Sequence, residues 1–139
     1  ITAMINMEMI GKPSKFGQGK LWMTGIKRSN LGAILNKALR NSAIQTEIYP
    51  DPYPEEHLFY RSDNATLARL GVPAHSFSSV QLNNDEHYHA PSDELATVSL
   101  RSLAIAIETL AKGTGSLASG KVTPTRVDIS KVTPDGRIY

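Results

Sequence analysis

The sequence has no cysteine, few aromatic residues and no long hydrophobic run. The absence of cysteine from all 139 residues excludes a disulfide framework, a thiolate zinc site and a cysteine nucleophile. No apolar stretch approaches the roughly 18 residues that would indicate a membrane span. Lys and Arg number 15 against 13 Asp and Glu, without a dense basic cluster, so nucleic acid is not an expected partner. A hydrophobic content of 40% fits one domain with its own core.

The chain opens on a strand-like run, residues 1–10, made almost entirely of Ile, Met and Ala with Asn6 and Glu8 as its polar members. This pattern predicts a strand covered on both faces, as in a parallel sheet. Because the run starts without Met and without a lead-in loop, we expect the chain to be part of a larger domain. Three shorter apolar runs predict further strands, at residues 21–26, 44–49 and 74–80.

Helices are predicted between and after these strands. Residues 31–39 carry apolar side chains at helical spacing, and residues 62–70 form a shorter helix. A long helix follows the polar loop at 81–93 and stops at Gly113. Its apolar stripe is formed by Leu100, Leu103, Ile107 and Leu110. The alternation of elements predicts an α/β fold with a mostly parallel sheet flanked by helices, where ligands bind at the carboxyl ends of the strands.

The composition changes after Gly113 to Gly, Ser, Thr, Lys and Pro. We therefore divide the chain into residues 1–112, which carry the domain, and residues 113–139, a linker or tail. Residues 127–139 could form a hairpin about the Pro-Asp-Gly turn at 134–136, although two isolated strands are only marginally stable.

Glu8 is the first candidate functional residue. A carboxylate buried inside an apolar strand is costly unless it is paired or bound to a metal. If Met7 and Met9 face one side, Asn6 and Glu8 share the other, and Glu8 lies near the carboxyl end of the strand. Two interpretations stay open: a carboxylate that is salt-bridged or solvated at the strand end, and one that serves a site.

Two further segments carry candidate residues. The loop at 84–93 holds two imidazoles, His87 and His89, close to several carboxylates, and such a group suits a metal ligand as well as it suits solvated side chains. Asp93 could instead be the N-cap of the long helix. In the segment 60–64, Ser62 or Asp63 could cap the short helix, or Asp63 could face the same strand-end cleft as Glu8.

Three blocks of sequence together carry a resemblance to a known family. They are residues 6–11 (Asn-Met-Glu-Met-Ile-Gly), residues 61–64 (Arg-Ser-Asp-Asn) with Leu-Gly-Val-Pro-Ala at 70–74, and residues 88–93 (Tyr-His-Ala-Pro-Ser-Asp). In this order and at this spacing they resemble the last three signature blocks of the di-zinc aminopeptidases. That family also resembles glutamate carboxypeptidase and, more distantly, glutaminyl cyclase. The resemblance covers about residues 1–112 and says nothing of the tail.

The resemblance implies a three-layer zinc-peptidase fold (phosphorylase/hydrolase-like), incomplete in this chain, with two zinc ions at the carboxyl ends of the strands. Glu8 and His89 fall on metal-ligand positions of the family. Tyr88 resembles the family tyrosine that can donate a hydrogen bond to the tetrahedral oxyanion, which would make it a catalytic residue. Asp63 matches an acidic position close to the metals, and Asp93 matches one that helps to hold the histidine loop.

Two positions depart from the family pattern. The family usually has Asp where this chain has Glu8, and the extra methylene moves the carboxylate by about one bond length, so the strand or the rotamer must adjust. The usual Ser-Asp-His is Ser-Asp-Asn here. Asn64 keeps a hydrogen-bonding side chain, but it cannot take a proton or bind zinc as histidine can.

The family's other functional residues all precede the strand that begins at Ile1: a His-x-Asp ligand, a bridging Asp and a Glu-Glu pair of base and ligand. We therefore expect this chain alone to bind zinc weakly or not at all and to be inactive, since a catalytic zinc keeps three protein ligands. A sheet without its neighbouring strands exposes an apolar edge. The expected partners are therefore the missing amino-terminal part of the domain or a second copy, in a homo-oligomer.

The resemblance implies that the intact protein is a zinc-dependent exopeptidase, first of all an aminopeptidase, that hydrolyses peptide substrates through a metal-activated water. One alternative is an inactive binding or dimerisation member, because the same scaffold resembles the transferrin-receptor ectodomain. A second is an acyltransferase similar to glutaminyl cyclase, with one zinc. Export is common in the family, so an extracytoplasmic location, periplasmic or secreted, is expected.

Overall fold

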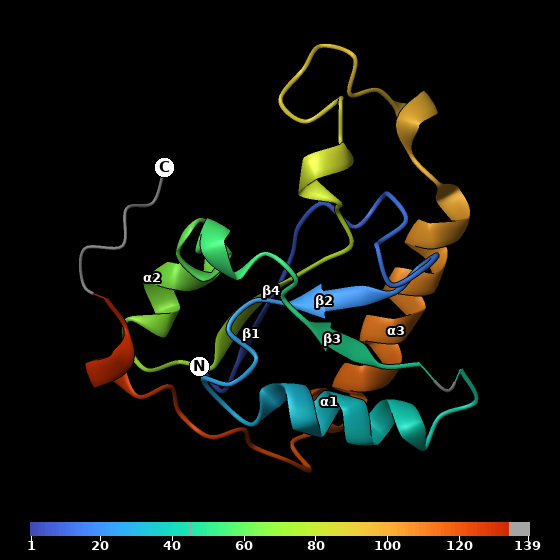
Figure 1. Ribbon diagram of the computed structural model, residues 1–139. Coiled ribbons are helices and arrows are strands. Elements are labelled where there is room, and N and C mark those ends of the chain that lie inside the picture. Colours follow the sequence, from blue (N-terminus) through green and yellow to red (C-terminus); the bar gives the residue numbers. More distant parts are fainter. Residues whose placement is uncertain (45, 134–139) are drawn as a thin grey trace.

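One four-stranded sheet organises the fold (Figure 1). The structure is a computed structural model that describes residues 1–44 and 46–133. The strands lie in the order β1-β4-β2-β3. β1 runs parallel to β4 and β2 parallel to β3, whereas β2 runs antiparallel to β4. Their bounds are β1 (Met4–Met7), β2 (Leu21–Met23), β3 (Ile48–Pro50) and β4 (Ala74–Ser78).

The direction of β2 makes the sheet mixed. A parallel return needs a crossover connection, usually a helix. The segment between β1 and β2 contains no helix, and β2 runs opposite to β1 and β4. The predicted α/β class is confirmed, with a mixed sheet in place of a largely parallel one. The more specific zinc-peptidase fold remains a prediction.

Two helices, α1 (Leu31–Arg40) and α3 (Leu100–Ala118), pack together against the sheet (Figure 1). The predicted helix at 31–39 is confirmed, and its leucines at positions 31, 35 and 39, four residues apart, all turn inward. Leu35 and its neighbours on this stripe have no exposed surface. Burial of one such side chain contributes about 1.5–3 kcal/mol. The core that they complete is formed by Leu21, Met23, Leu31, Leu35, Leu39, Ile48, Phe77, Ala106 and Leu110.

A third helix, α2 (Asn64–Ala68), packs on β1 and β4 and belongs to a second core. This core contains Phe59, Ala68, Val72 and Ala74. Ala74 and Phe77 belong to opposite cores because an odd separation along a strand places two side chains on opposite faces. Short 3-10 helices connect the elements: η1 (Pro54–Glu56), η2 (Leu58–Tyr60), η3 (Leu82–Asn84), η4 (Leu95–Thr97) and η5 (Ile129–Lys131).

The long helix differs from its prediction at both ends and on its buried face. Ser99, not Asp93, is its N-cap, and its hydroxyl accepts a hydrogen bond from the Ser102 N–H at 3.2 Å. The helix passes Gly113, which is buried against α1, and continues to Ala118. Small residues face the core, so two residues of the predicted stripe, Leu100 and Ile107, are exposed. Its buried residues are Ser102, Ala106, Thr109, Leu110 and Gly113.

The segment after α3 packs back onto the domain. Val127 and Val132 are buried, and the Val127 N–H donates to the Gly71 carbonyl at 3.0 Å. The Arg126 guanidinium donates to the carbonyls of Leu70 and Ile1 at 3.2 and 3.1 Å. Up to residue 133 this segment therefore belongs to the fold and is not a free linker. Residues 127–133 form no strand, and the remainder of the predicted hairpin, 134–139, lies outside the described residues.

β1 is shorter and less buried than predicted. It forms one edge of the sheet, its residues are half-buried or exposed, and Met7 is 56% exposed. The other predicted strands also shorten at their ends, and part of the run at 44–49 falls on residue 45, outside the described residues. Within 1–44 and 46–133, no helix is long and apolar enough to cross a membrane.

Candidate active site

Glu8 lies just past the carboxyl end of β1. Its N–H donates to the Phe77 carbonyl at 3.0 Å, which extends the pairing of β1 with β4 by one bond. The next residue, Met9, has a φ of 52° in the left-handed region, so the strand direction ends there. The Glu8 side chain is exposed, and its carboxylate accepts a hydrogen bond from the Ser62 hydroxyl. It is therefore a solvated carboxylate at the strand end and not a buried charge.

A chain of side-chain hydrogen bonds runs from Glu8 into the interior. The Ser62 hydroxyl, which donates to Glu8, accepts from Asn6 Nδ2 at 2.7 Å. Asn6 Nδ2 donates its second proton to the Ser76 hydroxyl at 2.9 Å, and Ser76 donates to Asn64 Oδ1 at 2.8 Å. Each hydroxyl has one proton, and the Asn6 amide supplies both donors between the two hydroxyls. Every bond in this chain therefore has a determined direction.

Asn64 is the last residue in this series of hydrogen bonds and lies inside the protein. Its side chain is fully buried, and Nδ2 donates to the Phe59 carbonyl at 3.0 Å and, at 3.4 Å, to the Ala74 carbonyl. An amide suits this position because it accepts one hydrogen bond and donates two. Asn64 thus has a structural place in this site, beneath the residues that hold Glu8.

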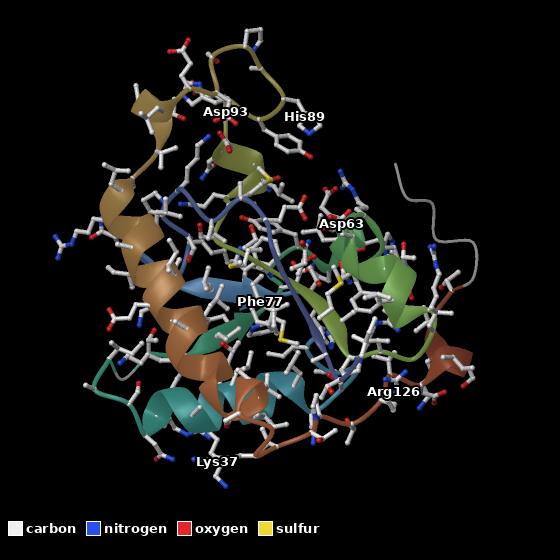
Figure 2. The ribbon with its side chains drawn as sticks, turned by 180° about the vertical axis from the view of Figure 1, so that it is seen from behind. Lys37, Asp63, Phe77, His89, Asp93 and Arg126 are labelled. Carbon is white, nitrogen blue, oxygen red and sulfur yellow. The ribbon has the colours of Figure 1, made fainter. Side chains whose placement is uncertain are left out.

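Neither predicted side-chain cap of the short helix is formed. The Ser62 hydroxyl contacts Glu8 and Asn6, and only the backbone carbonyl of Ser62 accepts from the helix, from the Ala65 N–H at 3.0 Å. Asp63 occupies the N-cap position but makes no capping bond, and it is exposed. In Figure 2, Asp63 at the start of α2 lies on the same side of the molecule as His89.

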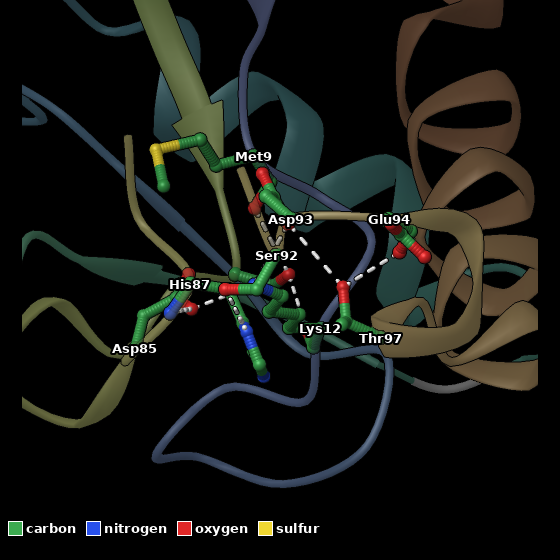
Figure 3. A network of polar contacts seen from close by, with 9 residues as sticks. Met9, Lys12, Asp85, His87, Ser92, Asp93, Glu94 and Thr97 are labelled. Atoms are coloured by element: carbon green, nitrogen blue, oxygen red, sulfur yellow. Dashed lines mark hydrogen bonds and ion pairs between the residues drawn. The ribbon is translucent and has the colours of Figure 1, made fainter. Parts of the chain in front are cut away.

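The histidine loop, residues 85–93, is attached to the segment after β1 by one lysine (Figure 3). Lys12 Nζ lies 2.6 Å from Asp85 Oδ1 and 3.2 Å from Asp93 Oδ1. Asp85 Oδ1 also accepts from the His87 N–H at 3.1 Å. Desolvation raises the pKa of Asp85, but the hydrogen bonds from Lys12 and His87 outweigh it and hold this pKa below its ordinary value. The same bond to Asp85 raises the pKa of Lys12.

Tyr88 and His89 lie beside each other in this loop. Their ring centroids are 4.1 Å apart at an interplanar angle of 54°. His89 has a φ of 56°, a left-handed conformation that is uncommon for residues other than glycine. Such backbone conformations persist where surrounding structure imposes them, and they gather at functional sites. The second histidine, His87, pairs through Nδ1 with the Ser92 hydroxyl at 3.0 Å.

A small cavity of about 50 Å³ lies between the strand end and the loop. Glu8, Ser62 and Tyr88 line it together, although they come from three separate segments. The other lining residues are mostly apolar: Met9, Trp22, Thr24, Leu58, Arg61, Ser76, Ser78, Val80 and Leu82. Two predicted site residues, Glu8 and Tyr88, therefore share one cavity, whereas the other three, His89, Asp63 and Asp93, do not line it.

The sequence matches the model of one known protein family. The sequence profile of Peptidase family M28 matches residues 1–114. The chain belongs to peptidase family M28. Membership in M28 implies a metallopeptidase, a hydrolase that cleaves peptide bonds. Searches of curated proteins and of solved structures found no match to this chain.

Members of M28 are generally zinc-dependent. The Glu8 carboxylate and the His89 imidazole have the right chemistry to bind zinc, but a catalytic zinc keeps three protein ligands. Residues 1–44 and 46–133 hold no group of three or more His, Asp or Glu side chains placed to bind one metal ion. Within this part of the chain, Glu8 and His89 therefore do not by themselves complete a catalytic zinc site.

Sequence reasoning missed Lys12 and Ser76. Ser76 had a signal, because it interrupts an apolar strand just as Asn6 does in β1. Lys12 had none, since a lysine between Gly11 and Pro13 looks like any solvated turn residue. Its importance comes from contacts with residues 73 and 81 positions away.

Proposed function

We propose that the intact protein is a zinc-dependent exopeptidase that removes amino-terminal residues from peptides. Membership in M28 supports a metallopeptidase. The observation that carries the finer proposal is the cavity that Glu8 and Tyr88 share with Ser62. Its lining combines the Glu8 carboxylate, the Tyr88 phenol, the Arg61 guanidinium and several hydroxyls with apolar side chains, and a few converging polar groups among apolar ones are typical of ligand sites.

In this proposal Glu8 and His89 are metal ligands. Zinc, when bound, would lower the pKa of a water molecule and polarise the scissile carbonyl. The Tyr88 phenol, 39% exposed at the cavity, would donate a hydrogen bond to the oxyanion that forms on the attacked carbonyl. Ser62 holds the Glu8 carboxylate, and Asp93 holds the histidine loop through Lys12. The role of Asp63, close to the metals, rests on the family pattern alone.

The remaining ligands and the general base would come from an amino-terminal part of the same domain. We expect residues 1–139 alone to bind zinc weakly and not to hydrolyse peptides, because Glu8 and His89 supply two ligands and a catalytic zinc keeps three protein ligands. Metal analysis after dialysis of this chain tests the expectation. A tightly held zinc in stoichiometric amount would contradict it.

The activity itself is tested on the full-length protein with aminoacyl anilides. Glu8→Ala and His89→Ala should each lower kcat/KM by at least about 100-fold if these residues bind the metal. Glu55→Ala and His57→Ala are matched controls, because both side chains are exposed and neither lines the cavity, and they should leave kcat/KM unchanged. Tyr88→Phe should lower kcat by about 100-fold with a smaller change in KM, as expected for an oxyanion donor.

Two other outcomes would replace this proposal. The departures at Glu8 and Asn64 leave room for an inactive member that binds or dimerises. That interpretation requires a full-length protein without anilide hydrolysis and without bound zinc. Cyclisation of peptides with amino-terminal glutamine, in the absence of hydrolysis, would instead identify an acyltransferase similar to glutaminyl cyclase.

A further inference from the structure

Lys12 joins the two ends of the histidine loop to the strand that leads to Glu8. Its ammonium contacts Asp85 at the start of the loop and Asp93 at its end. The Asp85 side chain is only 5% exposed and that of Lys12 only 21%, so solvent screens this pair less than a surface pair. Figure 3 shows both carboxylates turned toward the lysine. One cation thus closes a loop that carries Tyr88 and His89.

The segment that carries Lys12 is itself firmly held. The Ser79 hydroxyl donates to the Lys12 carbonyl at 2.5 Å, and the Ser79 N–H donates to the Met9 carbonyl at 3.2 Å. From the other side, the Ser99 N–H at the start of α3 donates to the Gly11 carbonyl at 2.8 Å. Lys12 therefore extends from a base that is fixed to β4 and α3, four residues after Glu8.

The loop has few other attachments. Its backbone bonds are local turns, such as Tyr88 N–H to the Asp85 carbonyl at 3.2 Å and Ala90 N–H to the His87 carbonyl at 2.9 Å. In the part of the chain that the structure describes, the hydrogen bonds that connect residues 85–93 to segments distant in the sequence are both made by Lys12. Without that cation, the loop keeps its turns but loses its polar anchor to the body of the protein.

The negative charge of the loop also favours its contact with Lys12. Residues 85–94 contain four acidic side chains, Asp85, Glu86, Asp93 and Glu94, which repel one another in a short loop. The single positive charge of Lys12 lies between two of these carboxylates, Asp85 at the start of the loop and Asp93 at its end. The bond to Asp85 is the first cause that raises the pKa of Lys12, and it favours the charged form of the lysine.

We propose that Lys12 is a positioning residue of the active site, which holds Tyr88 and His89 at a fixed place relative to Glu8. The proposal rests on the function proposed above, because it assigns to Lys12 the geometry of two residues in that mechanism. Lys12 does not line the cavity that Glu8, Ser62 and Tyr88 share. It acts through Asp85 and Asp93.

The first test measures the loop without any need for activity. In the full-length protein, Lys12→Met should increase hydrogen exchange at the amides of His87, Tyr88 and Ala90 by about tenfold or more, while the amides of β4 keep their protection. Lys12→Arg should retain most of the protection, because a guanidinium can still bridge two carboxylates. Lys131→Met is the matched control, since it removes an exposed ion pair with Asp128 and should not change the loop.

The second test connects the loop to the site. Lys12→Met should lower zinc affinity, measured by competition with a chelator, by about 10- to 100-fold and should lower kcat more than it raises KM. Lys12→Arg should restore most of both values. Increased loop exchange with unchanged zinc affinity and kcat would overturn the positioning role, and unchanged exchange in Lys12→Met would overturn the attachment itself.

Failure of the proposed function is distinguishable from failure of this inference. A wild-type protein without zinc and without peptidase activity would overturn the function and, with it, the role of Lys12 toward a metal ligand. The exchange experiment would still decide whether Lys12 holds the loop, because that result does not depend on any reaction.

Discussion

The Ser62 hydroxyl donates a hydrogen bond to the Glu8 carboxylate across 54 residues of sequence. The direction of this bond is imposed, because the Asn6 amide already donates to the same hydroxyl at 2.7 Å. Ser62 can therefore only donate its proton outward, to Glu8. The carboxylate is held at one oxygen, Oε2, and its other oxygen stays free for a further partner.

Ser62→Ala should misplace the Glu8 carboxylate without unfolding the protein. In the full-length enzyme we expect kcat/KM on an aminoacyl anilide to fall by about tenfold or more, because residues that orient a metal ligand have effects of about this size. Ser62→Thr keeps the hydroxyl and should retain most activity. Ser119→Ala, at the exposed end of α3, is the control. Equal activity of Ser62→Ala and wild type would contradict a role for this bond.

Asn64→Ala should destabilise the fold. It removes the acceptor of the Ser76 hydroxyl and the donor to the Phe59 carbonyl, all in the interior. Buried polar groups left unpaired cost about 1–3 kcal/mol, and we expect the free energy of unfolding to fall by about that amount in urea titrations. Asn83→Ala, at an exposed position, should change it by less than about 0.5 kcal/mol. Equal losses in both variants would contradict the chain of bonds.

His75 should make stability depend on pH. Its ring is fully buried, and its nitrogens contact the Thr24 carbonyl and the Ser29 hydroxyl, both at 2.8 Å. Burial lowers the pKa of His75 to about 4, from 6.5 in the unfolded chain. The folded state thus binds fewer protons, so stability is complete above pH 6.5 and decreases as pH falls toward 4, by about 3 kcal/mol in total.

Urea midpoints between pH 7.5 and 4.5 measure this dependence. His75→Gln removes the titrating group, so its stability should vary less with pH than that of the wild type, even if it is lower at pH 7. His57→Gln, at an exposed position, should keep the wild-type dependence. The same slope in His75→Gln as in wild type would assign the effect to other groups.

Val127→Ala should show that the segment after α3 is part of the domain. Val127 is 4% exposed and lies where the chain is bonded to Gly71, so removal of two methyl groups should lower the free energy of unfolding by about 1–2 kcal/mol. Ile129→Ala removes more carbon from a side chain that is 61% exposed, and should cost less. A larger loss of stability in Ile129→Ala than in Val127→Ala would mean that the segment does not pack on the domain in solution.

Local pattern was sufficient for much of the fold. The spacing of Leu31, Leu35 and Leu39 predicts α1, and the structure confirms this helix. In a helix, residues three or four positions apart lie on one face, so their spacing decides which side chains are buried together. The prediction was wrong where a glycine was taken as a stop: Gly113 is buried against Leu35 and Leu39 of α1, and the helix continues to Ala118. Asp93 is not the N-cap of this helix, because the helix begins at Leu100 and Ser99 caps it. The Asp93 carboxylate contacts Lys12 instead.

For the site, sequence pattern was enough to identify the candidate residues, Glu8 at the strand end and the Tyr88-His89 pair in the loop. Sequence motifs were also enough to place the chain in M28. Tertiary structure alone decided that β2 runs against β4 and that Lys12 binds both ends of the loop. The difference comes from the distance along the sequence between the residues that interact. Helix and strand patterns repeat within a few residues, whereas a strand's neighbour or a lysine's partner is chosen among groups that meet only after the chain has folded.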